Sequence, residues 1–562
     1  MPKRARLTPA DFAEASWDDV LPYYDRLAEA PLTKRNVKTW LNSWAELEAA
    51  VGEAIAVASV AFSANTADPE LEASHLRFAT EIQPNCAEQF VRLGSRLIEL
   101  GYGPADLRPT LRNIQNQAEL FREENLPLQQ ALQPLDLEYQ RITGEMTAIW
   151  EGERVPVAYL GLHMRSPIRA ERKRAVVKYC APYLRQRDEL AAIFDRQLEL
   201  RQQIARNAGF TNYLEYAFRE KNRFDYGPAE CADFHDAVEQ TVVPVLERRY
   251  ERLRRMLRVK SIRPWDIRAD PRNREALRPF QDAHDLAERA EGVFRLVDPV
   301  FGDRFARMRA EGLLDLEARE NKAPTGFCTS LLASERPLIF MNAVGSAQDV
   351  DTLLHEGGHA MHLFEIFEAQ PPYLRDWPPM EFTEVGSMAM ELLAGPFLSE
   401  FYSEPDAKRA RIEHFSQMLE LFAYIASIDA FQHWLYTDSD AADREARDEA
   451  WVRISERFNG GIDWAGFEAE QRIQWYQQIL IFTAPLYMME YAIAQIGALQ
   501  IWQRSLIDRE AAIRDYRRAM ALGNTRSLPE LFETAGAKFR FDAEKLGELV
   551  EVVEAELERL EG

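Results

Sequence analysis

The chain has 562 residues, a hydrophobic content of 46% and a formal net charge of −23. A chain of this length folds into two or more lobes, and its acidic balance disfavours nucleic acid and anionic membrane surfaces as partners. The four cysteines form no CxxC pair, so we expect reduced, mostly buried thiols.

The chain begins with MPKRARLTPADF, which contains basic residues. No apolar run of the kind found in a secretory signal comes after them. The most apolar stretch, residues 479–501, contains Pro485, Glu490 and Gln495, which favours a buried helix over a membrane span. We therefore expect a cytoplasmic protein with no membrane partner.

Most of the sequence repeats apolar residues at the three- and four-residue spacing of amphipathic helices. Such helices are predicted at 37–63, 84–100, 170–207, 229–257, 408–436 and 541–560. Strand pairs are expected at 146–150 with 154–159, and at 325–332 with 338–342. The sequence therefore predicts a mainly α-helical protein with a small β-hairpin or sheet.

The second hairpin runs almost directly into residues 355–359, which read His-Glu-Gly-Gly-His. Residues four apart on a helix share a face, so both imidazoles can reach one tetrahedral Zn²⁺. Glu356 would lie beside the metal, where it can accept a proton from activated water. Ser346, with Asp349 three residues on, is a candidate N-cap for this helix. The alternative is an ordinary helix that carries two histidines.

Three neighbouring residues need their own interpretation. Gly357 and Gly358 each cost about 1 kcal/mol relative to alanine inside a helix, which indicates that another backbone or a substrate passes close by. His362 lies on the same face as His355. His362 could be a third ligand. We favour the alternative that it is a packed histidine or that it holds a ligand in place.

A catalytic zinc ion has three protein ligands and one open position. Residues 381–393 offer three carboxylates in an apolar, helix-prone setting, where an acidic side chain is costly unless it is paired or binds a metal. Glu384 and Glu391 share one face, and Glu381 lies one turn before Glu384. The spacing alone does not choose the ligand among them.

Residues 340–362 and 382–391 resemble the oligoendopeptidase F and thimet oligopeptidase family of zinc metallopeptidases. Residues 323–328, 431–436, 485–497 and 528–533 agree with its oligoendopeptidase branch. The resemblance covers residues 200–545 well and the N-terminal part more loosely. It implies one zinc ion per chain, with Glu384 as its third ligand and Glu391 holding a zinc histidine in orientation.

The resemblance also implies a two-lobed, mainly helical body with a deep channel that has zinc at its floor and admits short unfolded peptides. We expect residues 1–200 to form a helical lobe and one channel wall, and residues 201–562 to form the catalytic domain. The hairpin, with Gly326 and Phe327 at its start, would align the oligopeptide substrate along a strand edge. A hairpin that merely covers the core is the alternative. The oligomeric state stays open, with a monomer slightly favoured.

One part of the sequence departs from the family pattern. The family stabilises the oxyanion with a histidine and tyrosines on a C-terminal helix, and Leu480 stands where that histidine is expected. Tyr487 and Tyr491 remain, four residues apart on one helical face, as candidate catalytic residues. On spacing alone, two core aromatics would be the simpler interpretation.

The departure leaves three hypotheses. In the first, the chain is a working oligopeptidase in which Tyr487, Tyr491 or another group such as His433 replaces the missing donor. In the second, it is a zinc-loaded paralogue that binds peptides more than it cleaves them. The third, a helical scaffold with an adventitious HExxH, requires all the other matching segments to be coincidental.

Overall fold

The computed structural model describes residues 7–272 and 274–562. Residues 1–6, on which part of the signal-sequence expectation rests, therefore lie outside the described residues. The chain folds into two compact units, each assembled from three separate segments. Helices dominate both units, and the strands form two small sheets. The prediction of a mainly α-helical fold with a small sheet is confirmed.

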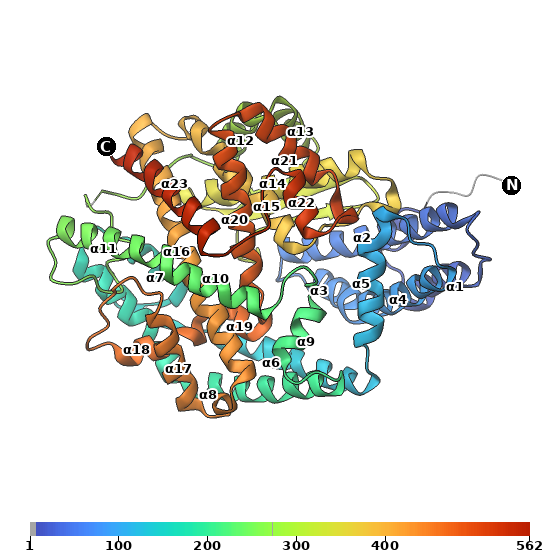
Figure 1. Ribbon diagram of the computed structural model, residues 1–562, viewed down its shortest axis with the longest axis horizontal. Coiled ribbons are helices and arrows are strands. Elements are labelled where there is room, and N and C mark those ends of the chain that lie inside the picture. Colours follow the sequence, from blue (N-terminus) through green and yellow to red (C-terminus); the bar gives the residue numbers. More distant parts are fainter. Residues whose placement is uncertain (1–6, 273) are drawn as a thin grey trace. The chain divides into compact units, whose positions relative to one another are not determined.

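Unit 1 comprises Met1–Glu119, Leu277–Arg411 and Gly497–Phe539. Its helices and strands are α1 (Trp17–Glu29), α2 (Val37–Ala64), α3 (Pro69–Arg77), α4 (Gln83–Leu100), α5 (Arg108–Leu120), α12 (Ala283–Val297), α13 (Pro299–Ala310), β3 (Leu314–Glu317), β4 (Phe327–Leu331), β5 (Arg336–Ala343), α14 (Ala347–Ala369), α15 (Met380–Ala394), α21 (Arg509–Met520) and α22 (Leu528–Thr534) (Figure 1).

Unit 2 comprises Leu120–Ala276, Ile412–Ile496 and Arg540–Gly562. Its elements are α6 (Leu126–Gly144), β1 (Thr147–Trp150), β2 (Glu153–Pro156), α7 (Leu160–His163), α8 (Arg169–Asn207), α9 (Tyr213–Glu220), α10 (Pro228–Thr241), α11 (Val243–Leu257), α17 (Arg444–Glu456), α18 (Glu468–Arg472), α19 (Ile479–Thr483) and α23 (Ala543–Glu561). Residues of both units occur in α16 (Glu404–Thr437) and α20 (Met488–Ser505), and the last residue of α5, Leu120, is the first of unit 2.

The two units differ from the predicted division at residue 200. That residue lies inside α8, and the segments of both units alternate along the chain. Periodicity reports which face of a helix is buried, but it does not report which distant segment covers that face. The predicted division into a lobe of residues 1–200 and a catalytic domain of residues 201–562 stays a prediction.

Most predicted helices match the structure within a few residues, and prolines explain the two main differences. The helix predicted at 229–257 is divided at Val242 into α10 and α11, and the apolar stretch at 479–501 is divided into α19 and α20. Pro244 stands in the first turn of α11, where a missing N–H costs nothing. Pro485 lies between α19 and α20, next to Leu486 with a φ of 62°.

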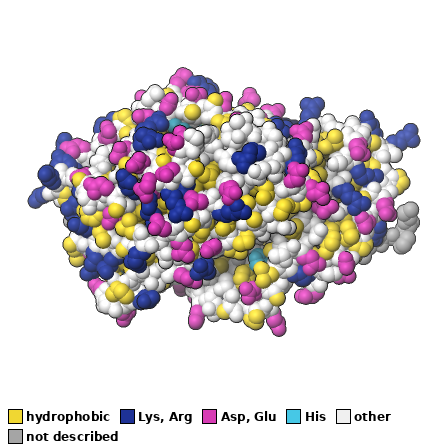
Figure 2. Space-filling model, turned by 90° about the horizontal axis from the view of Figure 1, so that it is seen from below, with side chains coloured by type: hydrophobic (Ala, Val, Ile, Leu, Met, Phe, Trp, Pro, Cys, Tyr) yellow, Lys and Arg dark blue, Asp and Glu magenta, His cyan; other side chains and the backbone are white. Residues whose placement is uncertain are grey.

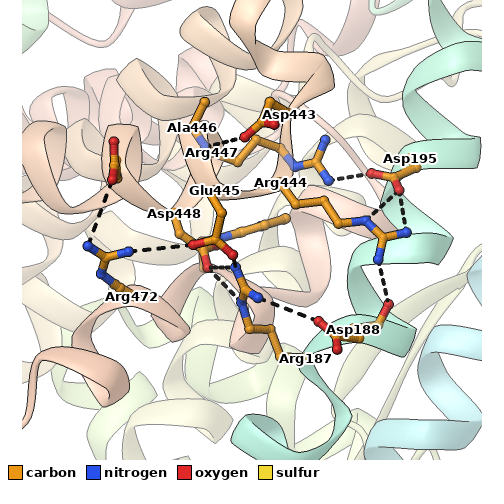
Figure 3. Close-up of polar contacts among 12 residues, drawn as sticks. Arg187, Asp188, Asp195, Asp443, Arg444, Glu445, Ala446, Arg447, Asp448 and Arg472 are labelled. Atoms are coloured by element: carbon orange, nitrogen blue, oxygen red, sulfur yellow. Dashed lines mark hydrogen bonds and ion pairs between the residues drawn. The ribbon is translucent and has the colours of Figure 1, made fainter.

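An ion-pair network holds α8 against α17 in unit 2 (Figure 3). Arg187 of α8 contacts Asp448 at 2.7 Å and Glu445 at 2.5 Å. Asp195, two turns further along α8, pairs with Arg444 at 2.6 Å and also with Arg447. Arg447 is fully buried, so this network lies partly inside the unit and is screened less than surface pairs are.

Surface charge and helix composition bear on the partners expected from the sequence. On the face drawn in Figure 2, acidic and basic side chains are interspersed. Among the described residues, α2 is the one helix that is long and apolar enough to cross a membrane, judged by length and composition alone. An 18-residue window of this helix has a mean hydropathy of 1.5. Core helices meet the same criterion, and α2 packs against α1, α3 and β4. We therefore interpret α2 as a packing helix of unit 1.

The three-stranded sheet of unit 1 leads directly into α14. Its strand order is β3-β5-β4, with β5 antiparallel to β4 and parallel to β3, a strand that the sequence did not predict. Ser346 caps α14 as expected: its hydroxyl accepts a hydrogen bond from the Asp349 amide at 3.3 Å. The Asp349 carboxylate accepts in turn from the Ser346 amide at 2.8 Å. This reciprocal cap fixes where α14 begins after β5.

Glycines let α14 and α15 pack with their backbones in close approach. A Cβ at Gly358 would lie 2.6 Å from the Ser387 Cα and 2.8 Å from the Gly386 carbonyl oxygen of α15. A Cβ at Gly357 would lie 2.2 Å from the ring of Phe294 on α12. The space that the two glycines leave is therefore filled by another backbone and an aromatic ring of the same unit, and not by a substrate.

This packing predicts that Gly358→Ala lowers the free energy of unfolding of unit 1 by about 1–3 kcal/mol, because backbone atoms of α15 must move. The matched control is Gly52→Ala in α2, where a Cβ would meet only a Leu332 methyl group at 3.7 Å. The control should keep or slightly raise stability, since alanine is the better helix former. Denaturant unfolding of both variants measures the difference. A Gly358→Ala protein as stable as the control would contradict the close approach.

Candidate metal centre

Two histidines of α14 and one glutamate of α15 converge on a single point in unit 1. Possible ligand atoms of His355, His359 and Glu384 all lie within 4.8 Å of one another. The Glu384 Oε2 atom is 3.2 Å from Nε2 of His355 and 3.5 Å from Nε2 of His359. The close packing of the two helices thus singles out Glu384 among the three carboxylates that the sequence offered.

Hydrogen bonds from neighbouring side chains fix the orientation of these groups. Nδ1 of His355 lies 2.6 Å from Glu391 Oε1, which turns Nε2 of the same ring toward Glu384. The Ser387 hydroxyl is 2.9 Å from Glu384 Oε2 and 2.9 Å from the Glu384 carbonyl oxygen. Glu391 therefore occupies the orienting position that the family resemblance implied, while Ser387 is an additional contact that spacing did not indicate.

The electrostatics of the site are those of buried groups held in close contact. Burial lowers the pKa of His359 to about 4, and the nearby His355 acts in the same direction. Burial also opposes a charge on His355, but its hydrogen bonds with Glu384 and Glu391 outweigh this and raise its pKa well above the usual value. The pKa of Glu384 is lowered, because both histidines outweigh the effect of burial.

Glu356 lies beside this cluster and contacts the sheet. Burial, with the negative charges of Glu384 and Glu391, raises the pKa of the Glu356 carboxyl to about 7. The positive charge of His355 and a hydrogen bond from the backbone N–H of Cys328 act in the opposite direction. A buried carboxyl with a pKa near neutrality is suited to accept and return a proton.

The hydrogen bond from Cys328 locates the outer edge of the sheet next to Glu356. Cys328 belongs to β4, which is the outer strand of the sheet. Gly326 is exposed immediately before β4, and the ring of Phe327 stacks on Phe340 at 5.0 Å. The hairpin predicted beside the metal helix is thus present, and its open edge reaches the candidate site.

A cavity of about 400 Å³ lies next to this edge within unit 1. Its lining comes from α2, β4 and α14 and includes Cys328, Phe367 and Trp377. The Trp377 ring also meets the His359 ring edge to face, with centroids 6.0 Å apart. Two lining residues of the cavity, Cys328 and Trp377, therefore adjoin Glu356 and His359 of the candidate metal centre.

The other predicted residues lie elsewhere. His362 is fully buried, with its ring against Trp377 at 5.3 Å and Phe382 at 6.2 Å, and it does not belong to the ligand cluster. A supporting role for it stays a prediction. Tyr487 and Tyr491 belong to unit 2, where their ring centroids are 5.3 Å apart. Their catalytic role also stays a prediction.

The chemistry of the donor set fits a zinc ion. Two imidazole nitrogens and one carboxylate oxygen form the ligand set of many catalytic zinc sites, and three protein ligands leave a position for water or substrate. In such sites a carboxylate usually accepts a hydrogen bond from the ring nitrogen of a histidine that does not bind the metal, and so fixes the orientation of that ring.

Comparisons with known proteins match the chain to peptidases. The model of peptidase family M3 matches residues 162–550. An oligoendopeptidase F homolog of Borreliella burgdorferi is 20% identical over 366 residues, which are 63% of this chain and 59% of that relative. The chain thus spans less than two thirds of the length of this relative.

Solved structures share the fold over nearly the whole chain. PZ peptidase A with an inhibitor has a TM-score of 0.87 and 24% identity, covering 97% of this chain and 98% of its own. An X-ray structure assigned to oligoendopeptidase F has a TM-score of 0.86 and 26% identity, covering 98% and 99%. These findings confirm the family resemblance drawn from the sequence.

The contact between Glu391 and His355 predicts that Glu391→Gln weakens zinc binding about 10- to 100-fold. The neutral amide of glutamine replaces the charged carboxylate that accepts from the imidazole and holds it in place. Competition with a chromophoric chelator measures the affinity. Glu368→Gln is the matched control, since Glu368 lies on the same α14 helix with its side chain 60% exposed. Equal affinities of the two variants would mean that Glu391 does not support a ligand.

Proposed function

The chain belongs to peptidase family M3, and on that basis we propose that it is a zinc-dependent endopeptidase that hydrolyses short, unfolded oligopeptides. The observation that carries the proposal is the convergence of His355, His359 and Glu384 within 4.8 Å of one another. Glu356, a buried carboxyl beside this convergence, supplies the proton acceptor that peptide hydrolysis needs. We also propose that the protein acts in the cytoplasm.

His355, His359 and Glu384 would hold the zinc ion, with Glu391 fixing His355. When bound, zinc polarises the scissile carbonyl and lowers the pKa of water beside it. The protein contributes the rest of the chemistry. Because the ligands come from two helices whose backbones are in contact, they keep their geometry without further rearrangement.

Glu356 acts as the general base in this proposal. Its carboxylate accepts a proton from the attacking water and then returns it to the departing amine, so that one residue serves both steps. The backbone N–H of Cys328 keeps this carboxylate in place at the sheet edge. A divalent cation nearby lowers the pKa of Glu356 below the value of about 7, which keeps the base ionised at neutral pH.

The open edge of β4 would align the substrate. An extended peptide can add to an outer strand through main-chain hydrogen bonds, which are independent of the peptide sequence. Gly326 offers its backbone without a side chain in the way, and the cavity lined by Cys328 and Trp377 can take one substrate side chain. The edge contacts Glu356 directly, so a peptide bound there would lie beside the base.

The second candidate function is a zinc-loaded paralogue that binds peptides and cleaves them weakly or not at all. Leu480, where the family has an oxyanion-stabilising histidine, is the observation that favours it. Loss of one oxyanion donor costs about 10²–10³-fold in turnover. In the favoured proposal Tyr487 and Tyr491 supply the remaining donors, and turnover is slow but measurable.

The role of the base predicts the behaviour of Glu356→Gln. This variant should keep the zinc content of the wild type and lose about 10²–10⁴-fold in kcat, because only the proton acceptor is removed. Metal analysis and hydrolysis of an internally quenched peptide measure the two quantities, and a chelator should stop hydrolysis by the wild type. Near-wild-type turnover in Glu356→Gln would show that another group is the base.

The departure at residue 480 predicts that Leu480→His raises kcat for the same peptide, by up to about 10²-fold if the imidazole donates to the oxyanion. Leu480→Gln, which has an amide in place of the imidazole, is the control for a polar side chain of similar reach. An unchanged or lower kcat in Leu480→His would count against placing residue 480 at the oxyanion.

A further inference from the structure

A second group of potential metal-binding side chains lies in unit 2 and contains none of the zinc ligands proposed for the peptidase site. Cys231 and His235 are four residues apart on α10, and Asp429 and His433 are four residues apart on α16. Residues four apart share one helix face, so each helix presents two potential ligands together. No spacing rule connects the two pairs in the sequence, because 198 residues separate Cys231 from Asp429.

The structure brings the four side chains to one point. Possible ligand atoms of Cys231, Asp429 and His433 all lie within 4.8 Å of one another. Asp429 Oδ2 is 2.9 Å from Nε2 of His235 and 3.3 Å from Nε2 of His433. The two imidazole rings meet edge to face with centroids 5.4 Å apart. Thiol, carboxyl and imidazoles thus converge as they do in protein metal sites.

Burial makes this convergence costly without a cation. Cys231 and Asp429 are 0% and 1% exposed, and His235 is 5% exposed. Within the described chain, Oδ1 of Asp429 is buried and accepts no hydrogen bond. The buried Nε2 of His433 has the 3.3 Å contact with Asp429 Oδ2 but no hydrogen bond of good geometry. A buried polar atom left without a partner costs about 1–3 kcal/mol, and an ion is one of the usual reasons for such atoms in native proteins.

One contact orients the aspartate. Nε2 of His235 lies 2.9 Å from Oδ2 of Asp429. His235 can therefore orient Asp429 while the opposite oxygen, Oδ1, faces no hydrogen-bond donor among the described residues.

We propose that Cys231, Asp429 and His433 bind a second zinc ion in unit 2, with His235 orienting Asp429. A thiolate, an imidazole and a carboxylate match the preferences of zinc, whereas magnesium and calcium select oxygen ligands. The ion links α10 to α16 and satisfies both buried atoms that lack hydrogen-bond partners. Its role is structural, because it would join two helices that are remote in the sequence.

Metal stoichiometry tests this site separately from the peptidase site. After reconstitution with zinc and removal of excess metal, the wild type should hold two zinc ions per chain. Cys231→Ser and His359→Ala should each hold one, and the double variant none. Cys180→Ser is the matched control, since Cys180 is also a buried thiol of unit 2 and should leave two ions bound.

Cobalt supplies a readout that reports the thiolate itself. When it is loaded with Co²⁺, the His359→Ala variant should show thiolate-to-cobalt charge-transfer absorption. The double variant with Cys231→Ser should lack this absorption, and the double variant with Cys180→Ser should show it. The double variant of His359→Ala with Asp429→Asn should also bind no cobalt. It tests the site without changing the cysteine, in case the cysteine variant does not fold. Circular dichroism checks that each variant keeps its helices.

The outcomes separate the two sites. If His359→Ala binds no metal, or binds cobalt without the thiolate absorption, the second site is refuted while the peptidase site stands. If Cys231→Ser binds no metal and His359→Ala binds one ion, the second site is supported and the peptidase site fails. Equal zinc content in Cys231→Ser and the wild type also overturns the second site.

Discussion

The close approach of α14 to α15 is the constraint on which the rest of the candidate site depends. Gly358 allows the backbone of α15 to pass where a Cβ would stand, 2.6 Å from the Ser387 Cα. At that separation Glu384 comes within 3.2–3.5 Å of both His355 and His359. A larger residue at 358 would push the carboxylate away from the imidazoles, so the glycine would act on the proposed metal binding through packing.

Charge compensation is the second consequence of this packing. Glu356, Glu384 and Glu391 are brought into one buried region, where mutual repulsion and burial both favour neutral forms. A proton on His355 compensates part of that charge, which is why its pKa is raised. The proposed divalent cation would compensate more of it. Its binding would therefore compete with protons and depend on pH.

The sequence predicts the local features well, because they follow from spacing along one helix. The HEGGH face, the Ser346 cap, the hairpin and most helix bounds all follow from residues near one another in the chain. Features that depend on distant segments were missed or left open. The choice of Glu384 over Glu381, the parallel strand β3 and the Cys231–Asp429 cluster each require knowledge of which segments pack together. The same limit explains why the alternation of segments between the two units was not predicted.

The account is tested most directly by hydrolysis of internally quenched peptides of increasing length by the zinc-loaded protein, with a folded protein as the longest substrate. It predicts measurable cleavage of short peptides that a chelator abolishes and added zinc restores, and no cleavage of the folded protein. If the fully zinc-loaded protein cleaves none of the peptides although it binds them, the claim that it is an oligopeptidase is contradicted.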